Sequence, residues 1–140
     1  MRNLAKTVLL FVCLAALAAL FPACNNSPTA PQLPNSFKIT DFQYVNEPGR
    51  TVGGQTIGTY TNNTASQATI TGTLNWGDGA SVNFTGSQVR PSASGNWAGD
   101  DGGGHLYTAK GTYHVEITAT CQFSNGPITD NFAKDIVVDK

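Results

Sequence analysis

Charged residues are scarce in this 140-residue sequence, and the scarcity excludes several classes of protein. Only 12% of the residues are Asp, Glu, Lys or Arg, and the formal net charge is −1. No run of lysine or arginine provides the basic surface that nucleic-acid binding needs. Catalytic spacings such as Gly-x-Ser-x-Gly or His-Glu-x-x-His do not occur. We therefore expect no nucleic-acid partner, no catalysis and no cofactor.

Cysteine is also scarce, and the three cysteines have different predicted fates. Cys13 lies in an apolar run of about fourteen residues, which is too short to cross a bilayer but suits the h-region of a signal peptide. Arg2 and Lys6 supply the positive n-region of that peptide. Cys24 ends the segment, and Cys121 falls on the apolar face of a predicted strand, where a lone cysteine is usually a small core residue. No intrachain disulfide remains to be formed if Cys24 is acylated.

The end of the apolar run resembles the lipobox of bacterial lipoproteins, in which the cysteine is diacylated and becomes the first residue of the mature chain. The sequence there reads Leu20-Phe21-Pro22-Ala23-Cys24. Ala23 suits the small-residue position before cleavage, whereas Phe21 replaces the usual Leu and Pro22 is an uncommon choice. The resemblance implies that a lipid on Cys24 anchors the protein to a membrane. The alternative is ordinary cleavage near Ala23, which leaves a free cysteine.

Composition divides the chain into three parts. We predict a signal peptide at residues 1–23, the lipid-anchored cysteine with a proline-rich tether at 24–35, and a globular domain at 36–140. Pro28, Pro31 and Pro34 punctuate the tether without periodicity, as in an extended linker. Asn25 follows the cysteine, which under the sorting pattern of some bacterial lipoproteins implies delivery to the outer membrane, on its periplasmic or its exposed side.

Alternation of apolar and polar residues predicts that the globular part is all-β. From Thr112 to Phe123 every odd position is apolar and every even position is polar, which indicates a strand with one buried face. Residues 68–76 and 128–139 alternate similarly, although Lys134 interrupts the apolar face of the second. Residues 37–45 change phase near Thr40-Asp41, as a strand with a β-bulge does.

Turns and loops separate these strands. Gly77-Asp78-Gly79 stands between residues 68–76 and a shorter alternation at 80–84, which predicts a hairpin. Residues 85–104 are polar and glycine-rich, and so long a stretch either contains a short strand near residues 88–90 or forms a functional or mobile loop. Because about seven short strands and no amphipathic helix follow the signal, we expect a monomeric antiparallel β-sandwich.

Two motifs resemble those of the PKD (polycystic kidney disease) domain. The first is an aromatic residue before Gly-Asp-Gly, here Trp76-Gly77-Asp78-Gly79. The second is His-x-Tyr-x-x-x-Gly-x-Tyr-x-Val, with fixed positions at His105, Tyr107, Gly111, Tyr113 and Val115. The resemblance implies an immunoglobulin-like sandwich, usually extracellular, that serves as a spacer or contacts proteins or carbohydrates without catalysis. Leu74 replaces the tryptophan that is usual in the family, and the segment between the motifs is longer than usual.

The PKD resemblance implies structural roles for Asp78, His105 and Tyr107, in which the aspartate holds its turn and the other two pack beside the long strand. The alternative is a metal site, above all for calcium on Asp100 and Asp101, since carboxylates and backbone carbonyls are calcium ligands. Further candidate ligands are Asp78, His105 and His114. Their spacing matches no known calcium loop.

Trp97 has two interpretations. In a stretch of Gly, Ser and Asn it is either an exposed aromatic that contacts a sugar or a protein pocket, or a loop residue that caps one end of the sandwich. The function expected from the whole sequence is a non-catalytic envelope lipoprotein that binds a protein or a polysaccharide. The alternatives are a structural spacer and a calcium-dependent adhesion domain.

Overall fold

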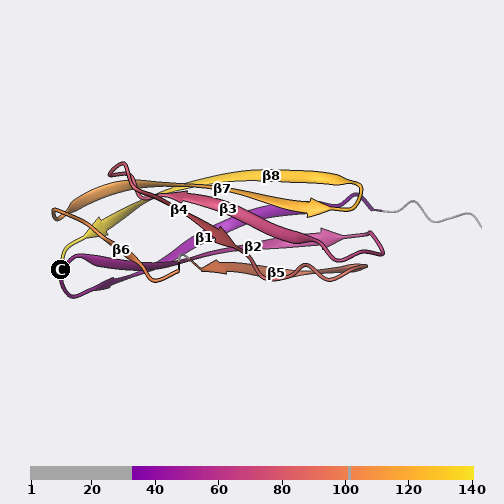
Figure 1. Cartoon of the computed structure of the whole chain (residues 1–140), viewed down its shortest axis with the longest axis horizontal. Coiled ribbons are helices and arrows are strands. Elements are labelled where there is room, and N and C mark those ends of the chain that lie inside the picture. The colour runs from indigo at the N-terminus through magenta and orange to yellow at the C-terminus, as the bar shows by residue number, and fades with distance from the viewer. Residues whose placement is uncertain (1–32, 101) are drawn as a thin grey trace, which may run out of the picture. The chain divides into compact units, whose positions relative to one another are not determined.

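The computed structural model describes residues 33–100 and 102–140, which form eight strands and no helix. The strands are β1 (Ser36–Glu47), β2 (Thr51–Asn62), β3 (Thr69–Asn75), β4 (Ser81–Thr85), β5 (Ala93–Asp100), β6 (His105–Leu106), β7 (Gly111–Phe123) and β8 (Gly126–Val138). They build two packed antiparallel sheets (Figure 1). The predicted all-β sandwich is therefore confirmed, with eight strands in place of about seven. The predicted signal peptide, Cys24 and most of the tether lie outside the described residues.

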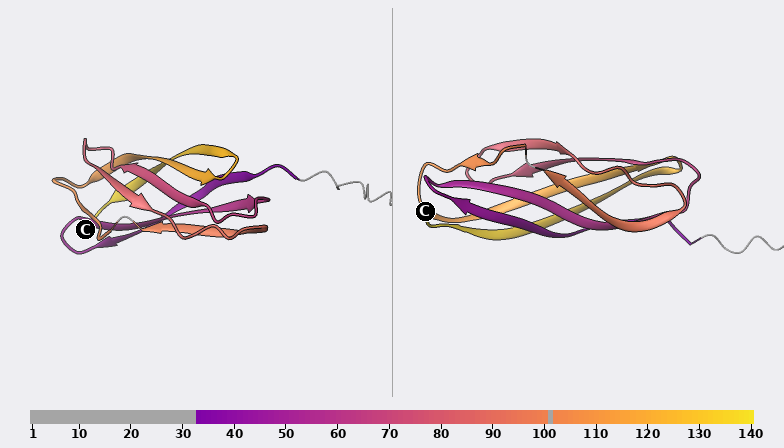
Figure 2. Two further views of the ribbon diagram at one scale, coloured as in Figure 1. Left: turned by 45° about the vertical axis from the view of Figure 1, so that its right-hand side comes forward. Right: turned by 90° about the horizontal axis from the view of Figure 1, so that it is seen from below.

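One sheet has the order β1-β2-β5, with β6 also paired to β2, and the other has the order β4-β3-β7-β8. The strands of both sheets run lengthwise along the sandwich (Figure 2). The described chain begins at one end of the sandwich, and β8 finishes at the other (Figure 1). The described residues include no helix that could cross a membrane.

The long strand β7 lies in the interior of its sheet and supplies much of the core. The prediction that one face of this strand is buried is confirmed, because alternate side chains are buried. These are Val115, Ile117, Ala119, Cys121 and Phe123, each at most 1% exposed. The facing sheet contributes Phe42 and Val52, both fully buried. Burial of this alternating stripe between two layers is what makes the sandwich stable.

The predicted bulge in β1 is also confirmed. The register between β1 and β2 shifts between Ile39 and Asp41. The extra residue lets Ile39 and Phe42 both face the core, where they are 2% and 0% exposed. Without the bulge, one of the two apolar side chains would point to solvent, because side chains alternate along a regular strand.

Lys134, which interrupts the apolar face of β8, joins the two sheets at the side where β1 faces β8. Its Nζ donates to Asp41 Oδ1 at 2.8 Å and to the Phe42 carbonyl at 2.9 Å. Four residues before Lys134, on the same face of β8, Asp130 Oδ2 accepts a hydrogen bond from the Ile39 N–H at 2.8 Å. These side chains satisfy backbone groups of an edge strand that would otherwise stay unpaired.

The Gly-Asp-Gly turn closes the predicted β3–β4 hairpin. Trp76 N–H donates to the Ala80 carbonyl at 2.9 Å, and Ala80 N–H donates to Asp78 Oδ1 at 3.1 Å. Gly77 has φ of 80°, and a Cβ on it would lie 2.5 Å from the His114 carbonyl oxygen. Glycine is therefore required there both by the left-handed backbone and by the lack of space.

Residues 85–104 are neither one long loop nor a loop with a single strand near 88–90. Val89 makes only an isolated bridge with Ala68, whereas residues 93–100 form β5, which pairs with β2 along its whole length. Ser87 N–H also donates to the Ala98 carbonyl at 2.7 Å, so the chain after β4 crosses to the opposite sheet. Pairing with β2 imposes the strand on a sequence of low β-propensity.

Candidate functional site

The residues of the two PKD-like motifs lie together beside the β3–β4 turn. The His105 ring stacks on Trp76 with ring centroids 5.1 Å apart, and the Tyr107 ring meets His105 edge-on at 4.6 Å. The Tyr107 hydroxyl donates to the Trp76 carbonyl at 2.9 Å and is buried. Tyr113 packs on Tyr107 at a centroid distance of 4.1 Å, and Val115 is fully buried.

Asp78 and His105 are joined by a hydrogen bond within this aromatic cluster. The distance from Asp78 Oδ2 to His105 Nε2 is 2.7 Å, and the two side chains are 19% and 18% exposed. Burial alone would raise the pKa of Asp78, but hydrogen bonds from His105 and from the Ala80 N–H outweigh that effect and hold the pKa below its ordinary value. The contact between Asp78 and His105 thus links β6 to the β3–β4 turn. Together with the ring contacts, it supports the structural roles that the motifs imply.

Trp97 is neither an exposed ligand contact nor a loop residue, so the expectation of an exposed aromatic is wrong. It lies on β5 and is 2% exposed. Its ring stacks on Phe37 at a centroid distance of 5.0 Å, and its Nε1 donates to the Lys38 carbonyl at 3.2 Å. Gly58 makes room for the ring, since a Cβ there would lie 2.3 Å from Nε1.

The candidate metal ligands do not converge in the part of the chain that the structure describes. Asp78 is paired with His105, and Asp100 Oδ1 accepts a hydrogen bond from the Gly102 N–H at 3.1 Å. His114 is exposed and lies 2.7 Å from Asp135, whose hydrogen bond raises the pKa of the imidazole. No three residues of residues 33–100 and 102–140 are arranged as metal ligands. Asp101 lies outside the described residues.

Cys121 offers no reactive thiol. It is fully buried on β7, and loss of solvation raises its pKa to about 11. At neutral pH such a group is a protonated thiol and not the thiolate that acts as a nucleophile. The described cysteine is therefore a core residue, as its position on the apolar stripe predicts.

The outer face of the β4-β3-β7-β8 sheet carries aligned rows of hydroxyl and amide side chains. Strand register places Thr85, Thr71, Thr120 and Thr129 side by side, and we name these the threonine row. The adjacent row, which we name the asparagine row, contains Asn83, Thr73, Thr118 and Asn131. All eight side chains are exposed except Thr120, which is half-buried. Neither row contains a charged group.

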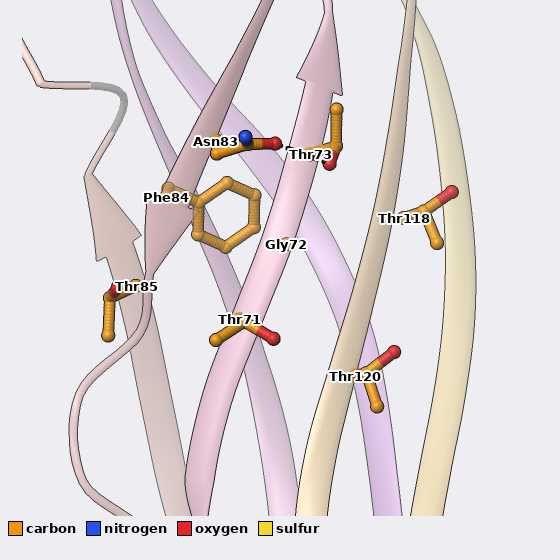
Figure 3. A pocket seen from close by; sticks show the side chains of 8 residues that line it. All are labelled: Thr71, Gly72, Thr73, Asn83, Phe84, Thr85, Thr118 and Thr120. Carbon is orange, nitrogen blue, oxygen red and sulfur yellow. Dashed lines mark hydrogen bonds between the residues drawn. The ribbon is translucent and has the colours of Figure 1, made fainter.

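A shallow hollow of about 440 Å³ lies between the two rows. Figure 3 shows six threonine and asparagine side chains around it, with Gly72 at its centre. The Phe84 ring packs beneath Gly72, because a Cβ on the glycine would lie 2.3 Å from the ring. The hollow is consequently lined by the Gly72 backbone, by part of the Phe84 ring and by polar side chains.

Hydrogen bonds fix most of the side chains in the two rows. Thr73 Oγ1 donates to Asn83 Oδ1 at 2.8 Å, Thr118 Oγ1 donates to Asn131 Oδ1 at 2.7 Å, and the hydroxyls of Thr120 and Thr129 lie 2.8 Å apart. Such cross-strand pairs stabilise a sheet modestly. The hydroxyls of Thr71 and Thr85 have no side-chain hydrogen bond to any described residue, so both can bond to a ligand.

Sequence reasoning identified the outward threonines of β3 and β7 but not the rows. The repeated Thr-x-Thr pattern at residues 69–73 and 118–120 is the only local signal, and it says nothing about which threonines become neighbours. Register between strands that are distant in sequence decides that.

No protein-family model matches the chain, and no curated protein matches it. The resemblance to the PKD domain therefore depends on the two motifs alone.

Proposed function

We propose that this protein is an exported, lipid-anchored protein of the bacterial cell envelope whose β-sandwich is a non-catalytic binding module. The observation that carries the proposal is the pair of uncharged rows around the hollow on the β4-β3-β7-β8 sheet. A surface that offers aligned donors and acceptors on a rigid sheet suits recognition of a polar partner, because its side chains lose little freedom on binding.

The chemistry of the remaining polar residues supports binding over catalysis. Asp78 and His105 are engaged with each other, and Cys121 is buried with a raised pKa. A catalytic base needs a reacting group within hydrogen-bond reach. Here Asp78 and His105 bond to each other and Cys121 is part of the core, so their removal is expected to affect stability and not turnover.

A purely structural spacer is the rival function. A spacer needs only a soluble surface, for which charged side chains serve well. The rows instead present eight uncharged groups in register. This arrangement favours a binding role for the sheet.

Anchoring is tested separately from binding. Cells that express the full chain are labelled with a palmitate analogue, and their membranes are fractionated. We expect label on the wild-type protein in the outer-membrane fraction. The Cys24→Ser variant should lose both the label and the membrane association. Wild-type protein without label would refute lipidation and leave the binding proposal to its own test.

Binding is tested with the mature chain that carries Cys24→Ser. This soluble protein is screened against immobilised glycans and against envelope extracts from the source cell. Saturable binding to either supports the module, and calcium chelation during the assay tests the adhesion alternative. A protein that binds neither, yet unfolds cooperatively, is a spacer.

A further inference from the structure

We propose that the threonine and asparagine rows bind a neutral polysaccharide whose chain crosses the strands of the β4-β3-β7-β8 sheet. The proposal rests on the binding function above and names its ligand class and its surface. The hollow between the rows, shown in Figure 3, is the groove for the chain.

The geometry of the rows fits a linear polymer of sugars. Adjacent strands in a sheet lie about 4.8 Å apart, so each row presents one hydroxyl or amide per strand at a spacing comparable to the length of one pyranose ring. The two rows are two residues apart along each strand, which is roughly 6.7 Å. A glycan chain that lies across the strands therefore meets one polar side chain on each flank at every strand.

The side-chain chemistry also matches sugars. Each threonine offers a hydroxyl group and a methyl group, and a sugar offers hydroxyl groups and C–H faces. Thr71 and Thr85 keep free hydroxyls among the described residues. The amide nitrogens of Asn83 and Asn131 also remain available as donors, because only their Oδ1 atoms accept the row bonds.

The lack of charge selects a neutral ligand. Glu116, in the row Ser81-Asn75-Glu116-Ala133, is the charged side chain nearest to the asparagine row. The row on the other side contains Thr69, Gln122 and Pro127. An anionic glycan would find no lysine or arginine on these rows and would face one carboxylate, so charge complementarity disfavours it.

A protein partner fits this surface less well. Protein interfaces depend on a few buried anchors, above all Trp, Tyr and Arg. The rows carry none of these. The exposed large hydrophobic residue on this sheet is Val137, which pairs with Thr112 near the end of β8, away from the hollow.

The ligand must be a polymer and not a single sugar. A net hydrogen bond is worth about 1 kcal/mol, and an open hollow surrounds its ligand incompletely. A monosaccharide that touches two or three groups would consequently bind very weakly, whereas a chain that spans four strands accumulates contacts. Rigid, mutually bonded side chains limit the entropy that binding costs.

The test uses affinity electrophoresis of the mature Cys24→Ser protein in native gels that contain one of three neutral polysaccharides: laminarin, hydroxyethyl cellulose or mannan. Polygalacturonate serves as the anionic comparison. The row variant is Thr71→Val with Thr85→Val, which removes two free hydroxyls and keeps the β-branched shape. The control variant is Thr59→Val with Thr112→Val, which changes two exposed threonines outside the rows.

We expect at least one neutral polysaccharide to retard the wild-type protein and the control variant equally. The row variant should bind it about tenfold more weakly, since two lost hydrogen bonds correspond to roughly one or two powers of ten at most. Its melting temperature should match that of the control, because neither hydroxyl has a side-chain partner among the described residues and valine favours strands.

Four results would overturn this inference. Equal retardation of the row variant and the control would move the glycan site elsewhere and leave the binding function intact. Retardation by polygalacturonate alone would refute the neutral ligand class. If none of the three neutral polysaccharides retards the protein but a protein from the envelope extract binds it saturably, the glycan ligand is refuted and the proposed binding function stands. Failure of every binding assay would refute both proposals.

Discussion

Replacing Tyr107 with Phe tests whether the aromatic cluster is a structural element. The Tyr107 hydroxyl is buried and donates to the Trp76 carbonyl at 2.9 Å, beside the hydrogen bond between Asp78 and His105. Phenylalanine keeps the ring contacts and removes only the donor. The carbonyl then stays buried without this partner.

The expected loss of stability follows from that burial. Leaving a buried acceptor unsatisfied costs about 1–3 kcal/mol. For a domain of this size, 1 kcal/mol lowers the melting temperature by roughly 4–8 °C. We therefore expect Tyr107→Phe to melt at least about 4 °C below the wild type, with its ligand binding unchanged.

Tyr113→Phe is the matched control. The Tyr113 hydroxyl donates to the Ala109 carbonyl at 2.8 Å, but this bond is exposed. Water replaces the lost partner there, so the expected cost is no more than about 0.5 kcal/mol. Thermal unfolding followed by circular dichroism measures both variants. Equal melting temperatures for the two would contradict the assignment of Tyr107 as a buried structural donor.

Three further predictions concern stability and reactivity. Gly58→Ala should lower the free energy of unfolding, measured with denaturant, by about 1–3 kcal/mol, because the new Cβ would lie 2.3 Å from Trp97 Nε1. Gly53→Ala is the control and should be nearly neutral, since a Cβ there has nothing within 4 Å. Equal losses for the two variants would show that the close approach of Trp97 to Gly58 does not limit the residue at position 58. The pKa of Asp78 is lowered by folding, so its contribution to stability is complete above its unfolded pKa of about 3.9 and declines as the pH falls below it. The difference in melting temperature between the wild type and Asp78→Asn should therefore narrow below about pH 4, and a constant difference would refute the linkage. Cys121, buried with a pKa of about 11, should resist a thiol reagent in the mature Cys24→Ser protein until denaturant unfolds it, and rapid labelling under native conditions would contradict its burial.

The local pattern of apolar, polar and turn residues was sufficient to predict much of the fold. The alternation of β7, the hairpin at Gly77-Asp78-Gly79 and the bulge near Thr40-Asp41 were all predictable, and each is present. In each case the signal lies within a few consecutive residues, because strand alternation and turn geometry are properties of the local backbone.

β5 was not predictable in the same way. Its sequence, ASGNWAGD, has glycine where a strand usually has an apolar side chain, and only Trp97 indicates which face is buried. The strand forms because β2 pairs with it, and the ring of Trp97 enters the core over Gly58. A reader of the sequence sees a tryptophan in a polar segment and cannot distinguish a core residue from an exposed one.

The amino-acid sequence by itself determined that the domain is all-β, which faces of its main strands are buried, and where the turn at Gly77-Asp78-Gly79 falls, since these depend on neighbouring residues. Only the tertiary structure decided that Lys134 joins β8 to β1, that Asp78 meets His105, and that the threonines of three strands align around one hollow. Such contacts depend on the register and packing of segments far apart in the chain, and the free energy that selects them is shared by the whole core.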